Sequence, residues 1–281
     1  MRTRGLFLLA IVLIVVGVGV ALYRGAGPLP NPEGCSATVA GRHVDLATDQ
    51  AENATLIAAI GVRRGLPARA VSIALATAFQ ESKIRNLSGG DRDSIGIFQQ
   101  RPSQGWGTRA QLRNRSYAIN AFYDALQKVH GYESMRITDA AQEVQRSGFP
   151  DAYEAHALDA RALASALTGY SPGGRFSCVV HASTRHGAAR AVEASLHRGY
   201  GPGLAVHRTG VRQDLVVRVP RSDAGSRLGW SVAQYLVAQA RRLHISEVHY
   251  AGRRWSAGDA SSNGWVRSEA GSRTRINITM G

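Results

Sequence analysis

Two cysteines, Cys35 and Cys178, stand just outside the ends of a region whose apolar residues recur at helical spacing. In an oxidising compartment such a pair can form a disulfide. Closing a loop of about 143 residues would contribute up to roughly 5 kcal/mol in the chain-entropy model. Two buried thiols are the alternative, and without histidines at ligand spacing we expect no metal site. We predict a disulfide that encloses a helical domain over residues 35–178.

The compartment is indicated by residues 5–23, which carry no charge. These nineteen residues, as a helix, would extend about as far as the hydrocarbon core of a bilayer. Arg2 and Arg4 precede the stretch and would keep the amino terminus cytoplasmic. We therefore expect a single-pass anchor in the cytoplasmic membrane, a linker over residues 24–34 and an extracytoplasmic bulk. A cleaved signal peptide ending near Gly25-Ala26-Gly27 is the alternative.

Between the cysteines the pattern predicts an all-α domain with one long loop. A helix capped by Asp49 should end near Gly65, and a second helix, beginning at Pro67, should end at Glu81. Later helices are expected over residues 117–129, 138–146 and 151–167. Residues 86–115 are rich in Gly, Ser, Asn and Arg and show no sustained period. Long loops of this kind in compact domains are usually functional.

After Cys178 the composition changes, and a linker over residues 179–187 leads to a small α+β domain over residues 188–281. Apolar patterns predict a helix over 188–197, strands over 215–219 and 276–280, an amphipathic helix over 228–243 and a hairpin over 248–255. The aromatic residues are expected in the core: Trp230, Tyr235, Trp255 and Trp265. This part resembles a carboxy-terminal module that recurs in secreted actinobacterial proteins, which implies an accessory role in binding the wall or a partner.

The chain has a formal charge of +14, and arginine supplies 32 of its 34 basic residues. Such a surplus favours an anionic partner, for which anionic wall polymers are candidates. No run of five basic residues and no basic motif with interleaved aromatics occurs, so we expect no nucleic-acid partner. The nine histidines include no His-Glu-x-x-His or His-x-His pattern. We therefore expect neither a metal nor another cofactor.

Glu81 is the strongest candidate for chemistry. It falls on the flank of the apolar helix face formed by Val71, Ala74, Leu75 and Ala78. A carboxyl group half inside an apolar wall should have a raised pKa, as general acids require. The alternative is an ordinary solvated helix glutamate. In the loop that follows, Gln99 and Gln100 offer amides that suit sugar hydroxyls and N-acetyl groups.

Three segments carry a family resemblance: Gln80-Glu81-Ser82, Ser94-Ile95-Gly96-Ile97-Phe98-Gln99, and Pro102. Together they resemble the signature of lytic transglycosylases and goose-type lysozymes, in which a helix ends in Glu-Ser and a Gly-Leu-Met-Gln-like loop follows. The surrounding sequence is similar to actinobacterial envelope proteins with a lysozyme-like domain. The resemblance covers roughly residues 48–170. It implies a lysozyme-like fold, peptidoglycan as the partner and Glu81 as the catalytic acid. The candidate sugar contacts are Ser82, Ser94, Gly96, Gln99 and Gln100, of which Ser94 and Gln99 stand at positions that match the family's loop motif. The alternative is that these side chains only satisfy backbone groups within the loop.

Other polar residues have two interpretations. Asp91 and Asp93 could activate water, as the resemblance to goose-type lysozymes implies, or could only stabilise turns. An aromatic-Asn motif of the family is missing from the later helix, where Gln145 is the nearest substitute and Glu143 is a rival carboxylate.

Two functions follow from these residues. One is a muramidase that cleaves the bond between N-acetylmuramic acid and N-acetylglucosamine, either by hydrolysis or by transglycosylation. The other is a protein that binds glycan strands on the same fold without cutting them.

Overall fold

The computed structural model describes residues 11–20, 31–149, 151–210, 214–269 and 271–281. The chain divides into two units, Met1–Pro32 and Glu33–Gly281. The described secondary structure is mixed, with helices and two antiparallel sheets.

The first unit corrects the predicted membrane span. Residues 11–20 are helical in the described part of this unit. Within the described ranges, no helix has the length and apolar character needed to cross a bilayer. The predicted single-pass anchor over residues 5–23 and the membrane localisation are therefore wrong. Residues 5–10 and 21–23, the alternative cleavage site and residues 24–30 of the linker lie outside the described residues.

A small sheet at the start of the second unit corrects the predicted all-α domain. Strand β1 (Gly34–Val39) lies between β2 (Arg42–Leu46) and β3 (Phe176–Val179), and both pairings are antiparallel. In β1, Cys35 and Ala37 are buried and their neighbours are more exposed. Small residues such as these give a weak alternating pattern, which is why the sequence did not indicate strands.

The helices of this half come before, within and after the predicted loop of residues 86–115. They are α2 (Thr48–Arg63), α3 (Ala68–Ser82), α4 (Arg109–Arg113), α5 (Arg115–Leu126), α6 (Ile137–Gln145) and α7 (Ala157–Leu167), with two 3₁₀ turns, η1 (Pro102–Gln104) and η2 (Ala152–His156). Asp49 lies inside α2 and does not cap it; the Gln50 side chain instead accepts from the Ala47 N–H at 2.8 Å. The loop after α3 contains two isolated bridges and the short elements η1 and α4, so it is a folded segment.

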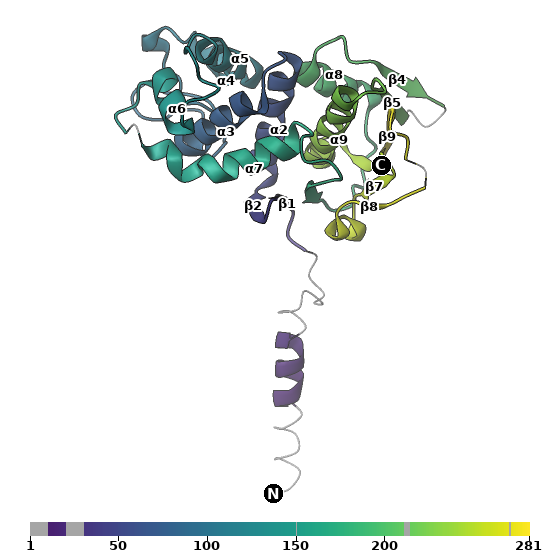
Figure 1. Cartoon of the computed structure of the whole chain (residues 1–281). Coiled ribbons are helices and arrows are strands. Elements are labelled where there is room, and N and C mark those ends of the chain that lie inside the picture. Colours follow the sequence, from purple (N-terminus) through teal and green to yellow (C-terminus); the bar gives the residue numbers. More distant parts are fainter. Residues whose placement is uncertain (1–10, 21–30, 150, 211–213, 270) are drawn as a thin grey trace, which may run out of the picture. The chain divides into compact units, whose positions relative to one another are not determined.

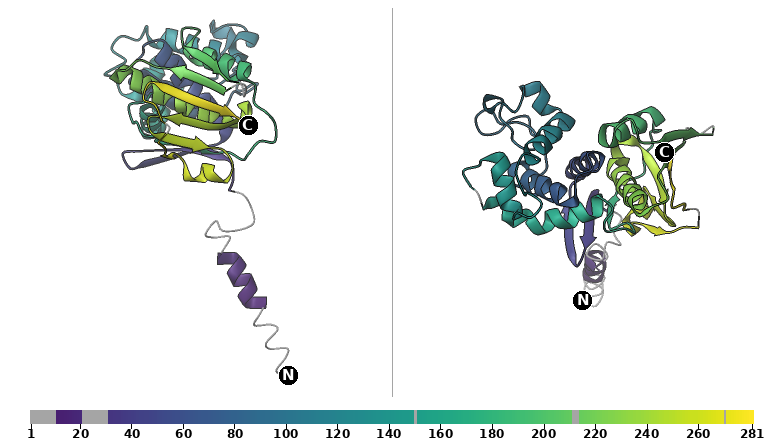
Figure 2. Two further views of the ribbon diagram at one scale, coloured as in Figure 1. Left: turned by 90° about the vertical axis from the view of Figure 1, so that its right-hand side faces the viewer. Right: turned by 45° about the horizontal axis from the view of Figure 1, so that its top comes forward.

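The remaining residues form a six-stranded antiparallel sheet with strand order β4-β5-β9-β6-β7-β8. Its strands are β4 (Val206–Thr209), β5 (Asp214–Arg218), β6 (Ile245–Tyr250), β7 (Arg253–Ser256), β8 (Val266–Arg267) and β9 (Arg275–Met280). The helical elements are α8 (Ala189–Tyr200), α9 (Asp223–Leu243) and η3 (Asp259–Asn263). Helix α9 packs on one face of the sheet, and Figure 2 shows the opposite face uncovered.

One core runs through residues 33–281. Helix α2 packs against α3, α5 and α7 on one side and against α8 and α9 on the other, as Figure 1 shows. Direct contacts join the halves: the Gln234 amide donates to the carbonyl oxygen of Ala166 at 2.9 Å. The division predicted near Cys178 therefore falls inside a single compact unit.

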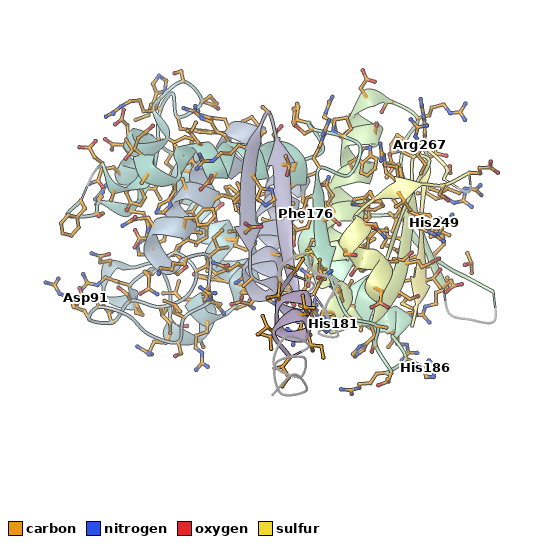
Figure 3. The ribbon with its side chains drawn as sticks, turned by 90° about the horizontal axis from the view of Figure 1, so that it is seen from below. Asp91, Phe176, His181, His186, His249 and Arg267 are labelled. Atoms are coloured by element: carbon orange, nitrogen blue, oxygen red, sulfur yellow. A yellow bond between two sulfur atoms is a disulfide. The ribbon has the colours of Figure 1, made fainter. Side chains whose placement is uncertain are left out.

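The aromatic residues of the carboxy-terminal part are buried, as predicted. The Trp255 indole donates to the carbonyl oxygen of Cys178, and the Trp265 indole donates to that of Phe176, both at 3.0 Å. These bonds tie β3 to the larger sheet; Figure 3 marks Phe176 beside the β1–β2 hairpin.

The predicted disulfide is confirmed. Cys35 and Cys178 are directly opposite in the β1–β3 pair and their sulfur atoms are bonded.

Replacing both cysteines, as in C35S/C178S, should lower the free energy of unfolding by about 2–5 kcal/mol, because the unfolded chain regains the freedom of the enclosed loop. Urea unfolding followed by circular dichroism measures the change. An unchanged midpoint would show that β1–β3 pairing alone holds the ends of the helical region together.

Candidate active site

Glu81 lies in the last turn of α3, and the core fixes this helix end. The apolar face predicted for α3 is fully buried: Val71, Ala74, Leu75 and Ala78. The helix packs against α6, η2 and α7, so its end cannot shift without disturbing close packing. The Glu81 side chain is half-buried. Its carboxyl group is thus held at the boundary between core and solvent.

Two residues from distant segments hold this carboxyl group. The Tyr153 hydroxyl, from η2, donates a hydrogen bond of 2.8 Å to Oε1 of Glu81. Gln145, the last residue of α6, hydrogen-bonds to the same carboxyl group. Its Nε2 also donates to the carbonyl oxygen of Phe98 in the loop at 2.8 Å. The structure therefore gives Gln145, predicted as a substitute for a missing motif, a direct contact with Glu81.

Burial raises the pKa of Glu81, while the hydrogen bonds from Tyr153 and Gln145 act in the opposite direction. Burial dominates because it disfavours the ionised form more than two hydrogen bonds favour it. A carboxyl group of this kind retains its proton to higher pH than a solvated glutamate. This property matches the expectation for a general acid.

The partners of Glu81 are themselves held. Tyr153 is fully buried, its hydroxyl hydrogen-bonds with Ser147, and burial raises its pKa. The His156 ring stacks on Phe79, with centroids 5.4 Å apart, and its Nε2 lies 3.2 Å from the Gln80 side-chain oxygen. These contacts fix η2 against the end of α3.

Ser82 and Gly96 shape the loop that follows Glu81. The Ser82 hydroxyl donates to the carbonyl oxygen of Ile97 at 2.6 Å and accepts from the Arg85 N–H at 3.1 Å. Gly96 has φ +82°, and a Cβ there would lie 2.7 Å from the carbonyl oxygen of Leu112. Ser94 is buried. These predicted sugar contacts are therefore engaged in, or enclosed by, the loop itself.

The two glutamines of the loop differ in accessibility. Gln100 is 2% exposed, and its amide donates to the carbonyl oxygen of Ala118 at 3.2 Å. Gln99 is half-buried, and its amide donates to the carbonyl oxygen of Gly96 at 3.0 Å. Of the two, Gln99 keeps surface available for a ligand.

The loop aspartates are not equivalent. Asp93 accepts from the Arg101 guanidinium at 2.9 Å and from the Ser103 N–H at 2.8 Å. These hydrogen bonds lower its pKa to about 2. The Asp91 side chain is 92% exposed, and Figure 3 shows it at the outer edge of the helical half. Asp93 thus has the geometry of a turn-stabilising residue, and an ionised group with so low a pKa is a weak base.

A cavity of about 810 Å³ adjoins the site through Gln145. Its wall also contains Trp106, Lys128, Glu143 and Arg146. Glu143 is exposed and Glu81 does not line this cavity. A chain-like ligand in the cavity would therefore contact the partner of Glu81 before Glu81 itself.

Tyr153 is the site residue that sequence reasoning missed. It lies 72 positions after Glu81, at the start of a segment predicted to be helical, whereas the aromatic partner was sought on the preceding helix. An aromatic residue just after the Gly148-Phe149-Pro150 break was the available signal. In the described part of the chain, no group of three or more His, Cys, Asp or Glu residues could hold a metal ion.

Tyr153→Phe should raise the pKa of Glu81 further, because the lost hydrogen bond favoured the carboxylate. If Glu81 acts as an acid, the alkaline limb of the pH–rate profile moves to higher pH and the maximal rate falls. Turnover measured across pH checks this. If the alkaline limb does not move, the hydrogen bond from Tyr153 does not influence the pKa of Glu81.

Glu81→Gln should stabilise the fold at neutral pH. Because folding raises the pKa of Glu81, the unfolded chain loses this proton first, and wild-type stability falls as pH rises from about 4.5. The variant lacks this loss. Urea unfolding at pH 4 and pH 8 should show an advantage of the variant that grows with pH; a constant difference would contradict the raised pKa.

Comparison with known proteins bears on the other half of the chain. A family model described as the VldE C-terminal domain matches residues 177–278, from β3 into β9. No curated protein matches the chain. The matched segment contains β4 to β8 and part of β9 but none of the residues around Glu81, so the chain is similar to this family in its carboxy-terminal part.

Proposed function

We propose that the protein is a peptidoglycan-cleaving muramidase that acts on the bond between N-acetylmuramic acid and N-acetylglucosamine. The observation that carries the proposal is the half-buried Glu81, whose pKa is raised by burial and which Tyr153 and Gln145 orient. The resemblance of residues 80–102 to lytic transglycosylases and goose-type lysozymes supports the same assignment.

In this mechanism protonated Glu81 donates its proton to the glycosidic oxygen as the bond to the leaving sugar breaks. The carboxylate that remains accepts hydrogen bonds from Tyr153 and Gln145, which stabilise its charge. Since the same two groups orient both forms, Glu81 can then act as the base that activates the attacking hydroxyl.

The state of Asp93 favours transglycosylation over hydrolysis. Its oxygens are bound by Arg101 and Ser103, and a pKa of about 2 makes it a poor base for water. Without a second carboxylate to activate water, the 6-hydroxyl of the N-acetylmuramic acid attacks carbon 1 of the same sugar. The glycosidic bond breaks and a 1,6-anhydro product forms. The amide and hydroxyl groups of the loop would position the glycan only where they remain accessible, as at Gln99.

The alternative is glycan binding without cleavage. One observation favours it: the 810 Å³ cavity is lined by Gln145 and Glu143 but not by Glu81. A strand held there would contact Trp106 and the amide of Gln145 without reaching the acid.

Mass spectrometry of fragments released from purified peptidoglycan by the full chain tests these functions. Wild-type protein should release 1,6-anhydro muropeptides, and Glu81→Gln should lower release by about 10²-fold or more. Glu193→Gln, which removes a carboxylate on α8 outside both the cavity lining and the contacts of Glu81, is the control and should retain release. Products with reducing ends would indicate hydrolysis. Binding to peptidoglycan without any released product would contradict cleavage and support glycan binding alone.

A further inference from the structure

Arginines gather at one end of the six-stranded sheet. Arg218 ends β5 and is directly opposite Arg275, which begins β9. At the far side of the sheet, Arg253 begins β7 and is directly opposite Arg267, which ends β8. Because all these pairings are antiparallel, the four positions lie at the same end of the sheet. With Arg273, just before β9, they form what we call the arginine edge: Arg218, Arg253, Arg267, Arg273 and Arg275.

At this end of the sheet, hydrogen bonds join the β6–β7 turn to the segment before β9. The Ala251 N–H donates to the carbonyl oxygen of Ser272 at 2.9 Å, and the Tyr250 hydroxyl donates to that of Arg273 at 3.2 Å. A hollow of about 610 Å³ lies beside the turn, lined by Arg253, Arg267 and Glu269 among others. The edge therefore combines a rigid backbone with a surface depression.

The charges of this edge are not neutralised within the described chain. None of its five arginines forms an ion pair with a described carboxylate, whereas Arg254 on the same sheet is 3.6 Å from Glu247. Like charges directly opposite on paired strands are destabilising, and the sheet has two such pairs here. Residues 188–281 contain fourteen arginines against six carboxylate side chains. A bound anion would relieve the repulsion at both pairs.

We propose that the arginine edge binds a phosphodiester-linked polyol polymer, the chemistry of an anionic wall polymer such as poly(glycerol phosphate). Guanidinium groups bind phosphate with two parallel hydrogen bonds. The register puts the Arg218–Arg275 pair on the open face of the sheet and the Arg253–Arg267 pair on the face of Tyr250 and Trp255, so a polymer that passes over the strand ends would meet cations from both faces. This proposal is independent of cleavage at Glu81, since none of the five arginines is among the described partners of Glu81. Figure 3 shows Arg267 and Asp91 on opposite sides of the unit.

Two observations favour this polymer over nucleic acid. Single-stranded nucleic acids need exposed aromatic rings on which bases stack. The aromatic residues nearest the edge, Tyr250, Trp255 and Trp265, are buried. The disulfide further indicates an oxidising compartment, where wall polymers are found and nucleic acids are not the usual partner.

Fluorescence anisotropy with end-labelled poly(glycerol phosphate) tests the proposal on the full chain over a range of NaCl concentrations. R218Q/R275Q should weaken binding about ten-fold and reduce the slope of log affinity against log salt by roughly 1.4, for two lost phosphate contacts. R253Q/R267Q should act similarly. The charge-matched control R190Q/R198Q changes exposed arginines of α8 and should alter affinity less than two-fold.

Thermal melting checks that each variant is folded, and R218Q/R275Q removes no described side-chain contact. Equal weakening by the edge and control variants would show that only net charge matters and would overturn the site. Absence of wild-type binding would overturn it as well. Tighter binding of a single-stranded oligonucleotide of matched charge, with the same sensitivity to R218Q/R275Q, would overturn the assigned polymer class.

Discussion

The burial of α2 on nearly all its sides is the constraint on which the second unit depends. From Asn53 to Gly61 every residue is buried, including the polar residues Asn53 and Thr55. A helix that is enclosed all round must have partners on every face. The helices beside Glu81 supply one side, and α8 and α9 supply the other. The amide of Gln239 on α9 donates to the carbonyl oxygen of Glu52 at 3.3 Å, so polar contacts as well as packing cross this boundary. The helical half and the sheet half therefore stabilise each other.

The same arrangement explains how the candidate site is kept rigid. Glu81 stands at the end of a helix whose other face is packed, and its partners come from α6 and η2. Ser82 and Asp93 hydrogen-bond to the backbone of the nearby loop, and Gln100 ties the loop to Ala118 on α5. Polar residues that the sequence suggested as ligand contacts therefore form hydrogen bonds that hold the loop in place. A carboxyl group with a raised pKa can be maintained only where such supports prevent water from reaching it freely.

Sequence patterns predicted part of this accurately. The end of the helix at Glu81, the buried aromatic residues and the disulfide follow from local periodicity and composition. The strands around Cys35 could not be predicted, because small residues alternate too weakly in hydrophobicity. The predicted membrane anchor rested on the uncharged composition of residues 5–23, and no helix within the described ranges has the length and apolar character to cross a bilayer. Tyr153 was missed because its contact with Glu81 depends on how η2 packs, and no spacing rule relates residues 72 positions apart.

The link between Cys35 and Cys178 makes the intervening chain a covalent ring. A protease that cuts one exposed peptide bond in this ring opens it without separating it into pieces. The helix bearing Glu81 would stay attached to both the amino-terminal and the carboxy-terminal segments, and the packed core could hold the cut ends in register. The chain would thereby remain in one piece after a first proteolytic cut that would divide an uncrosslinked chain.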